Sequence, residues 1–222
     1  RLYNSSHASG RGLCTRLSVC LALTPCAVCC CVPCACACVC VVCPCVRPQH
    51  IQPPGLLDGG DVLQLPGSRV VVVGLSRRTN AAALQQMQSM LPQHTLHAVS
   101  VAHGLHLKSA CTALDSSTLL YADNQAGLGL KQILQDHPAL STAGAGQPWQ
   151  HVVVQPECAN VLLLAGPGGQ HVVMCGGFPE SERIIGQLAA AKGLQLHELE
   201  FGEFAKADGS LTCCSILLPE GH

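Results

Sequence analysis

The sequence has few aromatic residues and few charges, and these two shortages exclude several classes of protein. Phe, Trp and Tyr make up 3% of the 222 residues, so the stacking platforms that hold nucleic-acid bases are not expected. Charged residues make up 11%, the formal net charge is −1, and no basic stripe runs along the chain. Both features argue against a nucleic-acid partner. The length suffices for one domain with a sizeable core, or for two small ones.

Acidic residues are missing from the beginning of the chain, and the cysteine content changes at the same point. All 13 Asp and Glu residues follow position 51, whereas 12 of the 17 cysteines lie between Cys14 and Cys45. We therefore expect residues 1–50 to be a Cys-rich low-complexity segment and residues 51–222 to be the folded domain. Because the chain begins with Arg1, we also expect it to be a fragment or an incomplete gene product.

Four interpretations of residues 1–50 are open. An apolar run resembles a secretory signal or membrane helix, but three prolines interrupt it. Cys-x-Cys spacings suit a thiolate cluster for zinc or copper(I), and palmitoylated cysteines would anchor the chain to a membrane. Alternating Cys and Val also match a translated TG repeat from an intron. We favour this last interpretation, exclude the segment from the fold, and expect a cytoplasmic protein without a membrane partner. The five remaining cysteines fit a reducing interior.

The remainder of the chain repeats the order strand, turn, strand, helix, strand about three and a half times. Strands are expected at 61–65, 69–73 and 97–101, at 109–114, 118–121 and 149–155, and at 160–164, 171–174 and 194–199, with helices over 80–91, 126–135 and 181–192. A final strand is expected at 211–218. Such repeats indicate a quasi-symmetric ring or solenoid.

Reactive residues recur at one phase of this repeat. Asp58 and Asp61 precede the first hairpin, His106 precedes the second, Asn160 begins the third, and Cys213 begins the last strand. In a ring of repeats, equivalent positions converge on the axis. An acid, a histidine and a cysteine would then meet, as the nucleophile, base and orienting group of a cysteine hydrolase or transferase do.

Four motifs carry a resemblance to a known family. They are Leu-Asp-Gly-Gly-Asp-Val-Leu at 57–63, Val-Gly-Leu-Ser-Arg-Arg-Thr-Asn at 73–80, Gly-Leu-His-Leu-Lys-Ser-Ala-Cys at 104–111 and Asp-Gly-Ser-Leu-Thr-Cys-Cys-Ser at 208–215. In this order and spacing they resemble dimethylarginine dimethylaminohydrolase of the guanidino-group-modifying, amidinotransferase-like superfamily. The resemblance covers about residues 55–218 and corresponds to the C-terminal portion of that family. It implies an α/β fold, the pentein-type five-module propeller of ββαβ repeats, here incomplete at the N-terminus.

The resemblance also implies roles for individual residues. Cys213 corresponds to the nucleophile, His106 to the general acid/base and Asp58 to the acid that orients the imidazole. The implied substrate-binding residues are Arg78, which matches the arginine for the α-carboxylate, together with Asp208, Ala207 and Asp61. The implied substrate is a small molecule, methylated arginine, and neither a metal nor a cofactor is expected. The oligomeric state is left open.

The implied reaction converts methylated arginine to citrulline and methylamine or dimethylamine through a covalent cysteine intermediate. Arginine and agmatine deiminases usually carry His-x-Asp where this chain has His106-Leu-Lys108, so Lys108 favours a methylated substrate. Two alternatives stay open: another guanidino-modifying enzyme such as these deiminases, and an inactive homologue that binds a partner or a soft metal. The second gains weight because the family's N-terminal modules supply acidic residues, and residues 1–50 have none.

Overall fold

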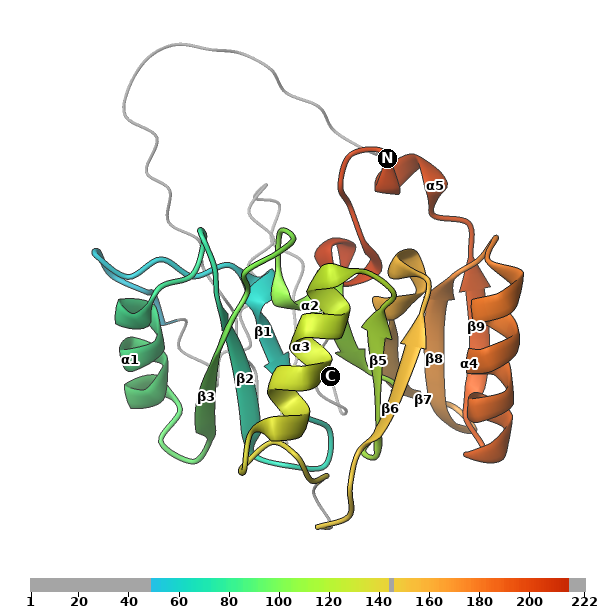
Figure 1. The fold of residues 1–222 in the computed structure, drawn as a ribbon, viewed down its shortest axis with the longest axis horizontal. Helices are drawn as coiled ribbons and strands as arrows, with labels where there is room; N and C mark the ends of the chain where they lie inside the picture. The colour runs from blue at the N-terminus through green and yellow to red at the C-terminus, as the bar shows by residue number, and fades with distance from the viewer. Residues whose placement is uncertain (1–48, 144–145, 216–222) are drawn as a thin grey trace, which may run out of the picture.

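The computed structural model describes residues 49–143 and 146–215, which form three modules of one plan (Figure 1). In each module two antiparallel strands are followed by a helix and a third strand, which pairs in parallel with the middle one. The first contains β1 (Val62–Gln64), β2 (Val70–Leu75), α1 (Ala81–Met90) and β3 (Thr95–Ser100); the second β4 (Cys111–Ala113), β5 (Thr118–Ala122), α3 (Gln125–Asp136) and β6 (Gln150–Val154); the third β7 (Leu162–Gly166), β8 (Gly169–Cys175), α4 (Pro179–Ala191) and β9 (Gln195–Leu199).

Local sequence explains why each module adopts this order. The middle strands β2 and β5 are continuous apolar runs, as expected for strands with a neighbour on each side and both faces covered. Asn80 and Asn124 precede α1 and α3, and each side chain accepts a hydrogen bond from a backbone N–H of the first turn. The helix then returns the chain to the end of the sheet where the middle strand began. A third strand that runs parallel to the middle strand requires this return.

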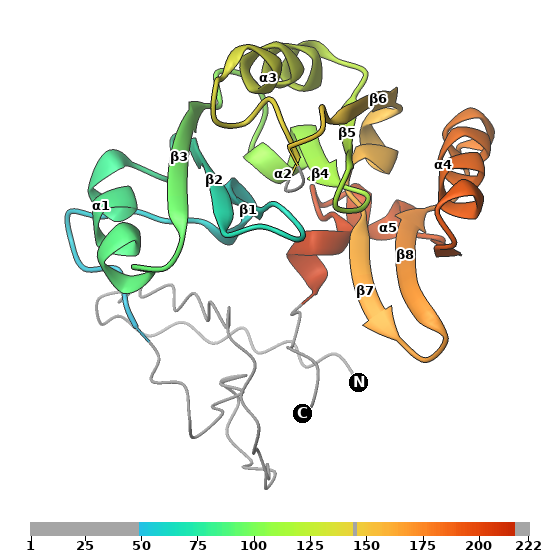
Figure 2. The same cartoon turned by 90° about the horizontal axis from the view of Figure 1, so that it is seen from below.

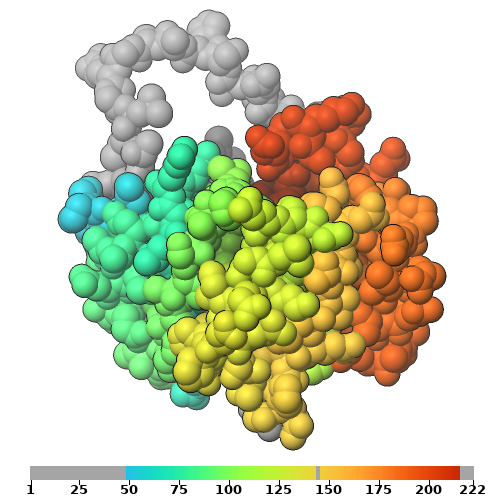
Figure 3. All heavy atoms as spheres, in the orientation of Figure 1, coloured from blue at the N-terminus to red at the C-terminus, as the bar shows by residue number. Residues whose placement is uncertain are grey.

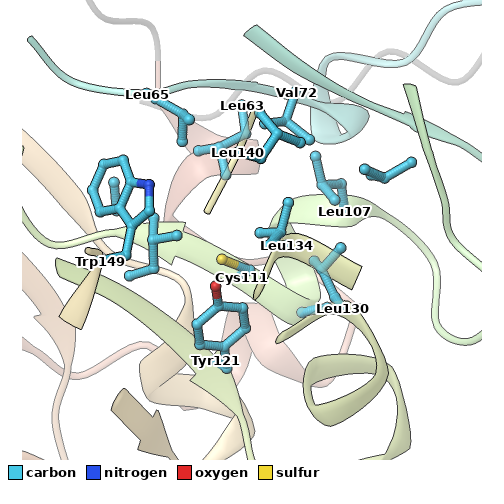
Figure 4. Packing of buried hydrophobic residues seen from close by; sticks show 14 of the residues in the cluster. Leu63, Leu65, Val72, Leu107, Cys111, Tyr121, Leu130, Leu134, Leu140 and Trp149 are labelled. Atoms are coloured by element: carbon cyan, nitrogen blue, oxygen red, sulfur yellow. The ribbon is translucent and has the colours of Figure 1, made fainter. Parts of the chain in front are cut away.

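The three modules follow one another around an arc, with α1, α3 and α4 on its outer side (Figure 2). A shared core joins the first two modules: Leu63, Val72 and Val99 of the first are in one apolar cluster with Tyr121, Leu134 and Trp149 of the second (Figure 4). A second cluster joins β5 and η2 (Pro156–Ala159) to β8 and α4. The modules adjoin in the space-filling view (Figure 3). Packing between modules therefore sets how the first strands β1, β4 and β7, on the inner side of the arc, lie relative to one another.

Short helical turns precede the first strand of every module, and they differ from the sequence-based expectation. These are η1 (Gly59–Asp61) before β1, α2 (Leu107–Ala110) before β4, and η2 before β7. Strands were expected to begin at 61, 109 and 160, but each begins one to two residues later. The expected strands thus had the correct order, and their first residues belong to these turns or lie beside them.

The final strand predicted at 211–218 is wrong for the residues that the structure describes. Leu211–Cys214 form a 3₁₀ helix, η3, in which the N–H groups of Cys213 and Cys214 both donate to the carbonyl of Ser210. The Ser215 hydroxyl closes the turn on the carbonyl of Leu211 at 2.6 Å. Hydroxyl groups at both ends favour a turn over an extended strand. Residues 216–218 lie outside the described part.

A short helix, α5 (Gly202–Ala205), was not expected and begins the connection from β9 to η3. This connection leaves the third module and returns over the ends of the strands towards α2 (Figure 1). In the described ranges no helix combines the length and the apolar character needed to cross a membrane. The Cys-rich residues 1–48 are not among those described.

Candidate active site

The short turns at the beginnings of the modules converge at one end of the strands. The turn η1 contacts both α2 and η3, and α2 contacts η2. Asp58 and His106 are the residues immediately before η1 and α2, and Cys213 lies within η3. Residues far apart in the sequence are therefore neighbours here because the short turns beside or within which they lie contact one another.

Asp58 and His106 form the centre of this cluster. Oδ2 of Asp58 lies 3.0 Å from Nε2 of His106 and 3.5 Å from Nη1 of Arg78. His106 is 6% exposed, and neither ring nitrogen has a hydrogen bond of good geometry within the described ranges, so its approach to Asp58 is a close polar contact with a poorly aligned N–H. Such misalignment is common for catalytic contacts in unliganded enzymes.

The carboxyl of Asp58 stays ionised in this setting. Burial acts to raise its pKa, but the His106 imidazole, the Gly60 N–H and the Arg78 guanidinium together hold that pKa below its ordinary value. An ionised carboxylate in contact with an imidazole limits the rotation of the ring. The pair therefore has the geometry of a general acid/base with its orienting group.

Gly60 lies directly against the imidazole. A Cβ atom at this position would be 2.5 Å from Cγ and 2.8 Å from Nδ1 of His106, closer than any real contact. Absence of a side chain at Gly60 therefore permits η1 to cover the ring. Gly60 of the first motif thus has a steric function that sequence reasoning did not identify.

Asp61 does not have the place expected of a substrate-binding residue. Its side chain is 0% exposed, and its carboxylate accepts hydrogen bonds from Ser76 Oγ at 2.7 Å, Thr79 Oγ1 at 2.7 Å and the Leu107 N–H at 2.9 Å. These donors occupy the carboxylate and leave no exposed atom for a ligand. We therefore correct the expectation of substrate contact: Asp61 binds the residue next to His106 and so fixes the beginning of α2.

Arg78 lies at the surface, where a ligand can reach it. Its side chain is 55% exposed, its Nη1 is 3.5 Å from Oδ2 of Asp58, and its own N–H donates to Ser76 Oγ at 3.0 Å. Among the residues that the structure describes, the guanidinium has a partner at one nitrogen and none at its other donors, an arrangement that suits a carboxylate ligand.

Cys213 is exposed on η3 and makes its hydrogen bond with Ser210, at 3.1 Å between Sγ and Oγ, rather than with His106. Burial lowers the pKa of the nearby Lys108 ammonium, and the Cys213, Asp58 and Asp61 side chains oppose that effect. Because η3 contacts η1, the turn of Cys213 lies beside the segment that carries the two acids.

Ala207 and Asp208 lie on the turn that follows α5 and precedes η3, and both are exposed. Asp208 has a φ of 56°, a left-handed conformation that Asp tolerates better than most residues, and its N–H donates to the Ala205 carbonyl at 3.0 Å. Both residues therefore lie at the surface, in the segment that leads to η3. No contact joins them to His106 or Asp58 among the interactions of the described residues.

The sequence is similar to known proteins that act on arginine and its methylated forms by name. Residues 46–142 match the family described as arginine deiminase. Over these residues the chain is similar to an arginine deiminase domain. It also resembles the dimethylarginine dimethylaminohydrolases: the protein of that name from Streptomyces coelicolor is 32% identical over 169 residues, which is 75% of this chain and 56% of the relative. The one from Pseudomonas aeruginosa is 26% identical over 174 residues, 76% of this chain and 58% of the relative.

Two solved structures share the mixed α/β fold of this chain. A mutant of the Pseudomonas aeruginosa enzyme complexed with citrulline superposes with a TM-score of 0.56 at 24% identity, over 73% of this chain and 56% of that one. A structure described as a putative arginine deiminase from Porphyromonas gingivalis has a TM-score of 0.53 at 15% identity, over 75% and 58%. The chain spans little more than half the length of the curated relatives it matches.

No metal centre is evident in the described ranges: they contain no group of three or more His, Cys, Asp or Glu residues placed to hold an ion. The Cys-rich segment proposed as a soft-metal ligand lies outside those ranges.

Proposed function

We propose that this chain is part of a hydrolase that converts N-methylated arginine to citrulline and an amine, with Cys213 as nucleophile. The 3.0 Å contact between Asp58 and His106, in the same cluster of turns as an exposed cysteine, carries this proposal. His106 is the general acid/base, Asp58 orients it, and Arg78 receives the α-carboxylate. Asp208 and the Ala207 carbonyl lie where the cationic guanidinium enters. Asp61 acts through the backbone of α2 and is not in this set.

The reaction balances on these residues alone. The Cys213 thiolate forms a bond to the guanidinium carbon, and the C–N bond to the methylated nitrogen breaks as His106 gives that nitrogen a proton. The result is an S-alkylthiouronium bound to Cys213 and a free amine. His106 then takes a proton from water, and the hydroxide adds to the same carbon. The C–S bond breaks to release the thiolate, and the added oxygen loses its remaining proton to solvent to give citrulline.

The proposed assembly is a five-module propeller of which the described residues form three modules. The arc of modules and the coverage of little more than half of each relative support it. Further modules, from sequence beyond these three, would complete the wall of the site opposite Arg78.

The test is citrulline release from asymmetric dimethylarginine by the purified chain, with Cys213→Ser and Cys214→Ser compared side by side. Both thiols are exposed neighbours on one turn, so the second variant controls for loss of a surface thiol. We expect release by the wild type and Cys214→Ser and none by Cys213→Ser. Release that persists in Cys213→Ser would refute the mechanism.

Arginine deiminase activity is the second candidate, because the family match and a structural neighbour both carry that name. Ammonia release from arginine, measured in the same preparations, separates the two. Turnover of arginine over dimethylarginine would transfer the proposal to the deiminases. No turnover of either, with stoichiometric zinc binding that is lost when residues 14–45 are deleted, would instead support the binding-protein alternative.

A further inference from the structure

Asn160 lies between the two segments that carry the proposed chemistry. It follows η2 and is 3% exposed. Its Nδ2 donates to the Lys108 carbonyl at 2.9 Å and to Thr212 Oγ1 at 3.0 Å, and its Oδ1 accepts from the Thr212 N–H at 3.0 Å. One side-chain amide thus contacts the second residue after His106 and the residue immediately before Cys213.

The position of Asn160 is itself set by the module that carries His106. The Thr112 hydroxyl donates to the Ala159 carbonyl at 2.7 Å and accepts from the Val161 N–H at 3.1 Å, so it binds both neighbours of Asn160. Thr112 is buried in β4, the strand that directly follows α2. The backbone on both sides of Asn160 is therefore bound by β4, the strand that follows His106 and α2 in the chain.

Other contacts of η3 do not determine its orientation as closely. Leu211 is buried against Leu162 and Cys175, but apolar packing is non-directional and permits rotation. The bonds from Cys213 and Cys214 to Ser210 are internal to the turn. Asn160 makes two directed hydrogen bonds with Thr212, one with its N–H and one with its hydroxyl, and a third with the Lys108 carbonyl of α2. Hydrogen bonds are geometrically demanding, so together they fix Thr212 with respect to α2.

We propose that Asn160 is a positioning residue that holds the Cys213 turn in register with His106. The effect of Asn160 on catalysis rests on the proposed function, whereas the hydrogen-bonded connection between η3 and α2 does not. Asn160 touches no reacting atom. It acts through Thr212 on one side and through the Lys108 carbonyl on the other.

The first experiment compares Asn160→Ala with Asn124→Ala. Asn124 also accepts a backbone hydrogen bond, from Gly127 at the beginning of α3, so its variant loses a structural contact away from the site. We expect Asn160→Ala to lower kcat for citrulline release about 10- to 100-fold with a smaller change in KM, because misplacing reacting groups by about 1 Å costs this much. Asn124→Ala should keep the wild-type kcat.

Amide hydrogen exchange gives a readout that needs no turnover. In Asn160→Ala the Thr212 N–H loses its acceptor, so we expect exchange at least about tenfold faster in residues 210–215, without an equal increase in α1 or α4. Uniform acceleration throughout the protein, or no change at 210–215 relative to Asn124→Ala, would overturn the inference. If exchange at 210–215 were faster in Asn160→Ala but the wild-type chain made no citrulline, the connection between η3 and α2 would be supported. The proposed function would then be rejected.

A second pair of variants keeps the inference testable if Asn160→Ala does not fold. Thr212→Val removes the hydroxyl that accepts from Asn160 and keeps the backbone bond, whereas Thr212→Ser retains both. We expect Thr212→Val to accelerate exchange at 210–215 and Thr212→Ser to restore the wild-type rate. Equal behaviour of the two would contradict a role for this contact.

Discussion

His106 directly precedes the short helix α2, Cys213 lies within the short helix η3, and the structure holds the two residues in opposite ways. His106 is buried, its ring lies against Gly60, and the next residue is bound by the interior carboxylate of Asp61. Cys213 is exposed on a turn that one asparagine and one leucine side chain connect to the modules. The histidine side of the site belongs to a core shared by two modules, and the cysteine side is attached to its surface.

This difference suits the two proposed roles. An imidazole packed on all sides keeps one orientation towards Asp58, and its proton transfer then has a fixed direction. A thiol at the surface stays open to the substrate and can move when the site fills. Variants on the histidine side should therefore affect stability and activity together, whereas variants on the cysteine side should affect activity alone.

The largest effect is expected on activity from His106→Ala. Loss of a general acid/base typically costs about 10²- to 10⁴-fold, and we expect kcat for citrulline release to fall by that range. His103→Ala is the matched control, because His103 is exposed on the loop that leads to His106. If His106→Ala retained the activity of the control, the acid/base role would be excluded.

Asp61→Ala should have the largest effect on stability. It leaves two hydroxyl groups and the Leu107 N–H without their acceptor in the interior, and we expect a loss of about 3–5 kcal/mol in the free energy of unfolding. Urea denaturation measures it, with the exposed Asp123→Ala as control. A loss no greater than that of Asp123→Ala would show that Asp61 does not anchor α2.

Gly60→Ala should have an intermediate effect on both quantities. The new methyl group overlaps the His106 ring, and accommodating such overpacking costs about 1–3 kcal/mol and shifts the imidazole. At the adjacent Gly59 a Cβ meets nothing within 4 Å, so Gly59→Ala changes the same motif without the clash. Denaturation and citrulline release should separate the two variants, and equal behaviour would argue against packing on the ring.

The smallest effect is expected on the free energy of unfolding at acid pH, through protonation of Asp58. Because the folded state holds the pKa of Asp58 below its ordinary 3.8, the carboxylate contributes stability above that pH, and this contribution is lost as the pH falls further. The stability difference between the wild type and Asp58→Asn should be constant near neutral pH and should shrink below about pH 4. A difference independent of pH would mean that the ionised carboxylate is not stabilised by its contacts.

The modular order could be predicted from the sequence because it depends on local signals. Alternation and apolar runs gave the nine strands of the three sheets, and helical spacing between Asn80 and Pro92 gave α1 within one residue at each end. The short turns were missed since a three- or four-residue helix has too little periodicity to detect. For the same reason 211–214 was taken as a strand, where apolar residues flank two cysteines but hydroxyl groups close a turn.

By itself, the sequence determined the repeat and its phase, and with them the residues that would meet: Asp58, His106 and the turn of Cys213. Only the tertiary structure decided what each of these residues does in the cluster. Asp61 binds a backbone group 46 residues away, and Asn160 binds two segments each 52 residues away. Such contacts depend on how the modules pack against one another. Local patterns specify the elements, but the inner ends of the modules are brought together by cores that several modules build in common.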